Sequence, residues 1–159
     1  MADVATQAVG TLKLVCFRLH AQEYGAEITE VKETIPVRPI TRVFLTPPWL
    51  AGIINLRGDV VAVLDLAQLL GLPASTVTDD SRIIIARVGG VVAGMLVDEL
   101  AELRTVQSAA LRPPPPTLSA EGSALLRGVV TLEDGAAVRV LDLPALFESE
   151  RLRAFQRRA

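Results

Sequence analysis

Cysteine, histidine and aromatic residues are all scarce in this sequence. Its 159 residues include one cysteine and one histidine, and aromatic residues make up only 4% of the chain. One cysteine cannot form a disulfide within the chain, and one cysteine with one histidine is too small a set of ligands for a zinc site. The apolar residues are aliphatic instead, with 23 Leu, 19 Val and 8 Ile. The sequence therefore predicts an aliphatic core with no metal or other cofactor.

An excess of charge of one sign and a long apolar run are also missing. The 16 basic and 18 acidic residues give a net charge of −2. This balance argues against a nucleic-acid binder, which needs a basic face to displace counterions. The most apolar window, Val88–Val97, has ten residues and three glycines, against the roughly 20 residues that a membrane-spanning helix needs. The first residues also lack the pattern of a signal peptide, so we expect a cytoplasmic protein that does not insert directly into a membrane.

The sequence has little that could serve as a reaction centre. His20 is the only histidine and lies at the end of a predicted strand, with no nucleophile or acid beside it that would make it a general base. Cys16 lies within the same apolar strand, without the neighbouring cation or helix N-terminus that activates a thiol. No phosphate-binding glycine loop or nucleophile-elbow motif occurs. We interpret Cys16 as a buried thiol and His20 as a strand-end residue, in a protein that is not an enzyme.

What the sequence does contain is a series of short aliphatic strands separated by glycine and proline. Alternating and β-branched residues predict the strands, and the Gly89-Gly90 pair and the acidic turn at 133–135 each predict a hairpin. Repeated prolines between Pro36 and Leu50 predict an irregular segment. The predicted strands are Thr11–Leu19, Val60–Leu64, Arg82–Val88, Val91–Val97, Val129–Leu132 and Ala137–Leu141.

Two segments fit more than one element, and a third is rich in proline. Apolar positions in Ala26–Thr34 and in Glu99–Arg104 fit a helical period and an alternating strand about equally. Both alternatives stay open from the pattern alone. The run Pro113–Pro116 predicts a polyproline II spacer.

A short pattern occurs twice, 77 residues apart. Val63-Leu64-Asp65-Leu66 and Val140-Leu141-Asp142-Leu143 each end an apolar strand, and each has an Arg-Gly pair upstream. Asp65 and Asp142 are suited to cap the short helices that follow, the second of which is predicted to run toward Arg158. The repeat predicts two small β-barrels built alike. Such barrels leave edge strands and a groove between them, which suits protein partners.

The run Gly52-Ile53-Ile54-Asn55-Leu56-Arg57-Gly58, followed by Val60–Leu66, resembles the CheW family of adaptor proteins from bacterial chemotaxis arrays. The likeness extends from about Leu12 to Phe147, which makes the Asn-Leu-Arg-Gly motif a specific signal. The other segments that resemble this family are Glu23–Gly25, Ile40–Val43, Pro47–Leu50, Arg82–Asp98, Arg127–Val129 and Leu141–Leu143.

The resemblance implies a mainly β fold of two SH3-like five-stranded β-barrels that share an apolar seam, with short capping helices and a C-terminal helix. It places a CheW-like domain over residues 12–147, a flexible tail over 1–11 and the end of the C-terminal helix over 148–159. It favours a strand over Glu99–Arg104 and a strand with a distorted start over Ala26–Glu33. It also implies a scaffold without catalytic activity.

The resemblance implies two protein partners. Members of the family couple the cytoplasmic tip of a chemoreceptor to a CheA-type histidine kinase, which they bind through the kinase's related regulatory domain. One alternative is a regulatory CheW-like module of a pathway that controls pili or gliding. The alternative from another class is a small β-barrel enzyme.

The resemblance also indicates which residues contact the receptor. Glu33 and Arg57 match family positions linked to receptor coupling, and Arg57 can offer a forked set of hydrogen-bond donors. The alternative for Arg57 is an internal ion pair with Glu33 or Asp65. The apolar residues predicted to line a groove for a receptor helix are Ile28, Val31, Ile35, Leu96 and Val97.

Contacts with the kinase are expected at the barrel ends. The resemblance makes the segment Arg42–Leu50 and the turn around Gly58-Asp59 the candidates. Asn55, from the same motif, completes the set of predicted protein-binding residues.

Overall fold

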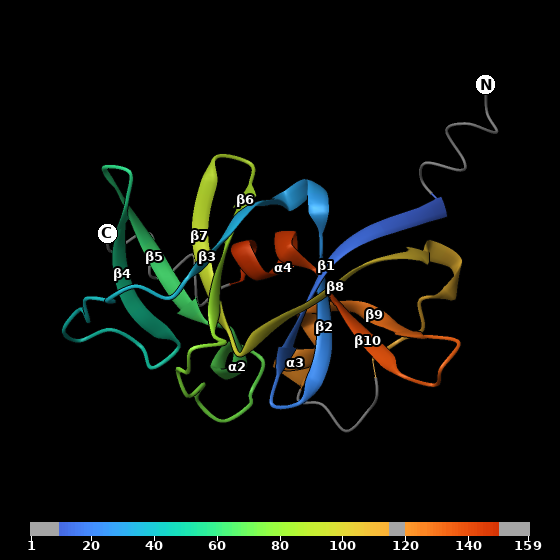
Figure 1. Cartoon of the computed structure of the whole chain (residues 1–159). Coiled ribbons are helices and arrows are strands. Elements are labelled where there is room, and N and C mark those ends of the chain that lie inside the picture. Colours follow the sequence, from blue (N-terminus) through green and yellow to red (C-terminus); the bar gives the residue numbers. More distant parts are fainter. Residues whose placement is uncertain (1–9, 115–119, 150–159) are drawn as a thin grey trace.

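The structure is a computed structural model that describes residues 10–114 and 120–149. Within these residues the chain forms two five-stranded sheets joined by short helical elements (Figure 1), so the predicted mainly β fold is confirmed. The strands are β1 (Thr11–Leu19), β2 (Gln22–Glu27), β3 (Val31–Pro36), β4 (Leu50–Leu56), β5 (Asp59–Asp65), β6 (Arg82–Val88), β7 (Val91–Val97), β8 (Glu99–Gln107), β9 (Leu126–Thr131) and β10 (Ala137–Leu141). The helices are α2 (Leu66–Leu69), α3 (Ala120–Ala124) and α4 (Leu143–Glu148), and the 3₁₀ turns are η1 (Ile28–Glu30) and η2 (Ser108–Ala110).

The two sheets use the chain differently. The sheet β3-β6-β7-β5-β4 comes from one continuous stretch and is called the central barrel here. The sheet β8-β1-β2-β10-β9 combines the first hairpin with the last three strands and is called the terminal barrel. Each has one parallel pair, β5 with β7 and β10 with β2. Figure 1 shows the central barrel on the left, the terminal barrel on the right and α4 between them.

Each barrel is closed by the chain that follows one of its edge strands. Thr41, beyond β3, pairs with Ile53 of β4, and Arg112, beyond β8, pairs with Val129 of β9. Two backbone hydrogen bonds of 2.8 and 2.9 Å join each pair. The closures cover edge strands that would otherwise offer unpaired backbone groups.

Both closures depend on a glycine in the facing strand. A Cβ atom on Gly52 would lie 2.3 Å from the Thr41 carbonyl oxygen, and a Cβ atom on Gly128 would lie 2.6 Å from the Arg112 carbonyl oxygen. Gly52 also has a φ of 150°, which favours glycine. The short repeat noted in the sequence is therefore part of a longer structural repeat that includes the two closures.

Asp65 and Asp142 cap α2 and α4, as the sequence predicted. The Asp65 carboxylate accepts the backbone N–H of Ser75 at 3.2 Å and, at a longer 3.5 Å, that of Gln68. The Asp142 carboxylate accepts the backbone N–H of Ala145 at 3.0 Å. Each cap satisfies backbone groups at a helix start and fixes the direction in which the helix leaves its strand. Both helices then bury their apolar side chains between the two barrels.

The core has three parts. Each barrel encloses its own cluster of buried side chains, and a third, larger cluster lies between the barrels. This third cluster, the apolar seam, draws on β1 and β2 of the terminal barrel, on β6 and β7 of the central barrel and on both capping helices, which confirms the predicted shared seam. Its most deeply buried large members are Phe17, Leu19, Tyr24, Leu66, Leu69, Ile84, Met95, Leu141 and Leu143.

The structure corrects the expectation for Ala26–Glu33. One distorted strand was predicted there, but β2 ends at Glu27, the turn η1 covers Ile28–Glu30, and β3 begins at Val31. The physical reason is that β2 and β3 belong to different barrels. The chain has to turn a corner between them, and a 3₁₀ turn supplies that corner.

The other open segments have different outcomes. The predicted strand over Glu99–Arg104 is confirmed, because it forms the first part of β8. The helix α4 ends at Glu148, and its predicted continuation toward Arg158 lies outside the described residues, as does the second half of Pro113–Pro116. In the part of the chain that the structure describes, no helix has the length and apolar character to cross a membrane.

The closures predict which glycines tolerate a side chain. We expect Gly52→Ala to lower the free energy of unfolding by roughly 3 kcal/mol, because the new Cβ meets backbone that cannot move without opening the barrel. Gly90→Ala is the matched control, since a Cβ there has no atom within 4 Å. Urea unfolding followed by circular dichroism measures both variants. Equal stability of the two would show that the closure at Gly52 is not tight.

Candidate protein-docking surfaces

Arg57 lies in a strained position at the tip of a tight hairpin. β4 ends at Leu56 and β5 begins at Asp59, so Arg57 and Gly58 form a two-residue turn, with φ values of 51° and 90°. Turns with two positive φ values favour Asn-Gly, because most other side chains clash in this conformation. The Asn55 side chain accepts the backbone N–H of Gly58 at 3.0 Å and holds the turn. The motif thus projects Arg57 outward at some conformational cost.

The Arg57 guanidinium forms an ion pair with the Glu33 carboxylate. Glu33 lies on β3 and Arg57 follows β4, and these strands are at opposite ends of the sheet order, so the pair spans the closing side of the central barrel. The hydrogen bond from Arg57 lowers the pKa of Glu33 and raises that of Arg57. The attraction is therefore present at neutral pH and is lost as the pH falls through the lowered pKa of Glu33.

Of the two internal partners considered for Arg57, the structure shows Glu33 and not Asp65. The Asp65 carboxylate is only 4% exposed and binds the side chain of Gln68 at 3.0 Å and the backbone of Ser75. The side chain of Arg57 remains 68% exposed in spite of its ion pair. An exposed pair of this kind adds little to stability, so Arg57 stays available to a partner.

The structure divides the five predicted groove residues into two groups. Ile28 is exposed and Val31 is half-buried, next to each other where η1 leads into β3. Ile35 and Leu96 are buried inside the central barrel, and Val97 is buried in the apolar seam. The prediction that these three side chains line an open groove therefore needs correction, because strand neighbours cover them. Ile28 and Val31 keep the exposure that a contact requires.

A hollow of about 370 Å³ adjoins the turn that carries Arg57. Aliphatic and charged side chains both line it. Val60 is 69% exposed at this hollow, although the sequence predicted only that it belongs to an apolar strand. The residues that line the hollow are Lys32, Leu56, Arg57, Asp59, Val60, Val61, Ile85 and Val92.

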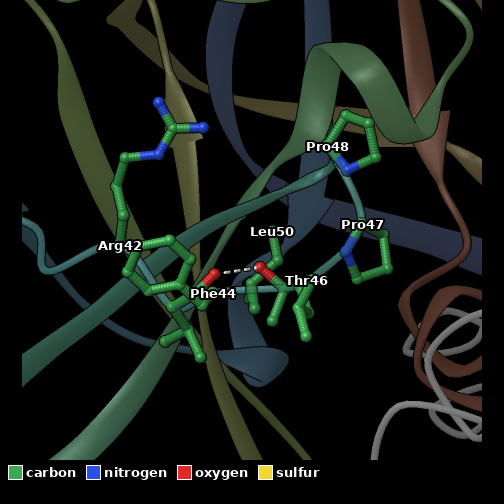
Figure 2. Close-up of a pocket in the computed structure, with 8 residues that line it drawn as sticks. Arg42, Phe44, Thr46, Pro47, Pro48 and Leu50 are labelled. Carbon is green, nitrogen blue, oxygen red and sulfur yellow. Dashed lines mark hydrogen bonds between the residues drawn. The ribbon is translucent and has the colours of Figure 1, made fainter.

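The segment Arg42–Leu50 forms a second hollow, of about 410 Å³ (Figure 2). Phe44 and Leu45 are 95% and 101% exposed, the highest values among the large apolar residues that the structure describes. The Thr46 hydroxyl donates a hydrogen bond of 2.7 Å to the Val43 carbonyl oxygen, which Figure 2 marks as a dashed line. The segment was predicted as a contact from the sequence, but Phe44 and Leu45 were not singled out within it. Two large apolar residues inside an irregular, proline-rich segment were the signal available.

The terminal barrel also exposes apolar side chains. Leu100 and Leu103 of β8 are 37% and 69% exposed. Ion pairs lie beside them, Arg18 with Glu99 at 3.0 Å and Arg104 with Glu23 at 2.5 Å. The exposure of these two residues could not be predicted while the segment fitted a helix and a strand equally well. Only the strand assignment decides which face of the sheet each side chain takes.

Cys16 and His20 do not form a reaction centre. The Cys16 side chain is fully buried, and burial, followed by the nearby Glu23 carboxylate, raises its pKa to about 12. The His20 ring donates to the Pro73 carbonyl oxygen at 2.8 Å, in a hairpin turn at the surface. Among residues 10–114 and 120–149, no group of three or more His, Cys, Asp or Glu side chains could hold a metal ion.

Two packed β-barrels that expose apolar side chains beside ion pairs are typical of a scaffold that binds other proteins. The sequence model of one family, described as the CheW-like domain, matches residues 13–151. The chain belongs to the CheW family and is a chemotaxis coupling adaptor, as the resemblance predicted.

Named relatives and a solved structure agree with this assignment. The chain is 33% identical over 141 residues to chemotaxis protein CheW of Rhizobium meliloti, covering 89% of this chain and 90% of that protein. It is 29% identical over 154 residues to protein FrzA of Myxococcus xanthus, covering 97% and 96%. The crystal structure of the scaffolding protein TtCheW from Thermoanaerobacter tengcongensis is similar, with a TM-score of 0.77, 34% identity and coverage of 88% and 90%.

The environment of Cys16 predicts an unreactive thiol. We expect no reaction with a chromogenic disulfide reagent at pH 8 in the folded protein, and complete reaction in denaturant. The folded-state pKa of about 12 lies above the ordinary 9.0. The contribution of the thiol to stability is therefore complete below about pH 9 and is lost as the pH rises toward 12. Rapid labelling of the folded protein would contradict the buried position.

Proposed function

We propose that this chain couples the cytoplasmic tip of a chemoreceptor to the regulatory domain of a CheA-type histidine kinase, without catalysing a reaction. Family membership supports the general kind of partner. The surfaces of the central barrel support the assignment of each partner to particular residues. The likeness to protein FrzA of Myxococcus xanthus fits the alternative of a pathway that controls pili or gliding, and the docking surfaces proposed here would serve either pathway.

The receptor surface is proposed at Ile28, Val31, Glu33 and Arg57. A receptor tip is helical, and a helix that docks on a protein surface uses apolar anchors spaced along one face together with polar contacts beside them. The exposed Ile28 and the half-buried Val31 supply apolar area at the corner between the barrels. Glu33 lies on β3, the strand that begins with Val31, and its ion pair with Arg57 of the β4–β5 turn adds a charge of each sign beside the apolar residues.

The observation that carries this proposal is the conformation of Arg57. An arginine with a φ of 51° is strained where asparagine would be tolerated. Its ion pair is exposed, so the pair stabilises the fold too little to offset the backbone strain at Arg57. Strain held at an exposed residue is typical of a functional position. The guanidinium can bind a carboxylate or carbonyl of a partner through two parallel hydrogen bonds.

The kinase surface is proposed at Arg42–Leu50 and at Gly58 and Asp59, which end the β4–β5 turn and begin β5. Exposed apolar side chains at a barrel end suit contact with the barrel end of a related domain. The large exposed area of Phe44 and Leu45 supports this assignment. Each contact need not be strong, because an array holds many copies together and gains affinity through multivalency.

The receptor surface is tested by Arg57→Asn. Asparagine suits the turn, so we expect the midpoint of thermal unfolding to stay the same or rise, while binding to a soluble receptor-tip fragment weakens about tenfold. Calorimetric titration measures binding. Arg18→Asn is the control, since Arg18 also makes an exposed ion pair, with Glu99, but on the terminal barrel.

Two results would count against this surface. Receptor binding that is unchanged in Arg57→Asn would show that the guanidinium is not a contact. An equal loss in the Arg18→Asn control would show that the effect is general charge and not position. Binding of the kinase regulatory domain is measured in parallel and should be retained in both variants.

A further inference from the structure

Leu45 is exposed and conformationally strained at once. Its φ is 60°, in the left-handed region that leucine rarely adopts. Its side chain and that of Phe44 gain nothing from burial, since both are almost fully exposed. In the isolated chain neither the backbone strain nor the apolar exposure has a compensating contact. A partner that covers both side chains would supply one.

The turn that carries Leu45 is held in place by one hydrogen bond across it and another just after it. The Thr46 hydroxyl binds the Val43 carbonyl oxygen, and the Leu50 N–H binds the Pro47 carbonyl oxygen at 3.0 Å. Pro47 and Pro48 further restrict the backbone. Figure 2 shows the two prolines on the side of the hollow opposite Arg42. The loop is therefore ordered before a partner arrives, which lowers the entropic cost of binding.

The charge around the loop is of one sign. No acidic residue occurs between Glu33 and Asp59, whereas Arg38, Arg42 and Arg57 all lie in that stretch. The Arg57 guanidinium is paired with Glu33, and Arg38 donates to the Asn55 carbonyl oxygen at 3.0 Å. Arg42 makes no ion pair within the described residues. The loop thus presents two apolar side chains and one cation that is free to pair.

We infer that Phe44, Leu45 and Arg42 form a preorganised anchor that binds an apolar depression bordered by a carboxylate on the regulatory domain of the kinase. This inference rests on the proposed function and names the three residues that determine its kinase contact. The apolar side chains supply the buried centre of the contact, and Arg42 supplies the charged pair at its edge. The expected partner surface is apolar and acidic.

Two other occupants fit the observations less well. A second copy joined by a two-fold contact would bring two unpaired Arg42 side chains together, with no acidic residue in the loop to separate them. A membrane surface needs two attachment signals for stable binding, whereas this loop has two apolar side chains and one unpaired cation. The loop also curves around a hollow, which suits a protein side chain better than a bilayer.

The test is calorimetric titration of the full chain with the purified regulatory domain of the CheA-type kinase encoded in the same genome. Leu45→Asn removes the apolar side chain and suits a positive φ, so the midpoint of thermal unfolding should stay the same or rise while the Kd rises at least tenfold. Phe44→Ser should raise the Kd similarly, and Arg42→Glu should raise it and reverse its salt dependence. Val77→Ser is the control, because Val77 is an apolar residue that is 53% exposed in another loop. The Kd of this variant for the regulatory domain should stay within twofold of the wild-type value.

The outcomes separate this inference from the proposed function. Wild-type binding that all three loop variants retain within twofold overturns the anchor and leaves the adaptor function standing. An equal loss in Val77→Ser overturns the anchor as well. Absence of any wild-type binding overturns the kinase part of the proposed function and the anchor with it. Wild-type dimers in sedimentation, or flotation with vesicles of anionic lipid, that Leu45→Asn abolishes would assign the loop to a second copy or to a membrane instead.

Discussion

The apolar seam between the two barrels is the contact on which the rest of the structure depends. A five-stranded barrel encloses too few side chains for a large core of its own, and each barrel here extends its core by burying a capping helix in the seam. The chain crosses between the barrels after β2 and again after β7, so the terminal barrel is completed only after the chain has formed the central barrel. The barrels therefore form one rigid support for the loops they carry.

That support explains how strained residues persist at the surface. Arg57 and Leu45 both have positive φ values, and both place a large side chain in solvent. Each is held by a local hydrogen bond, which the Asn55 side chain accepts in one case and the Thr46 hydroxyl donates in the other. Strain of this size is tolerated because the closed barrel on either side leaves the backbone no better path. A coupling adaptor gains from such positions, since a side chain held ready loses little entropy on binding.

Local patterns predicted much of this fold, and the failures have identifiable causes. Hairpin turns at Gly89-Gly90 and at 133–135, and the caps at Asp65 and Asp142, depend on neighbouring residues and were readable from the sequence. The strand β2 was not predicted as such, because its six residues lack a clear alternation. Ile35, Leu96 and Val97 were assigned to a groove by their position in the chain alone. Their burial depends on strands that come from elsewhere in the sequence.

The sequence by itself determined an aliphatic core, a repeated strand-cap-helix unit, a turn around Gly58, and the family. Only the tertiary structure decided which apolar side chains stay in solvent. Phe44, Val60 and Leu103 are of the same apolar residue types as many buried residues, yet they remain exposed. The physical reason is that exposure depends on how each barrel closes, through pairs such as Thr41 with Ile53. Those pairs join segments that no local pattern connects.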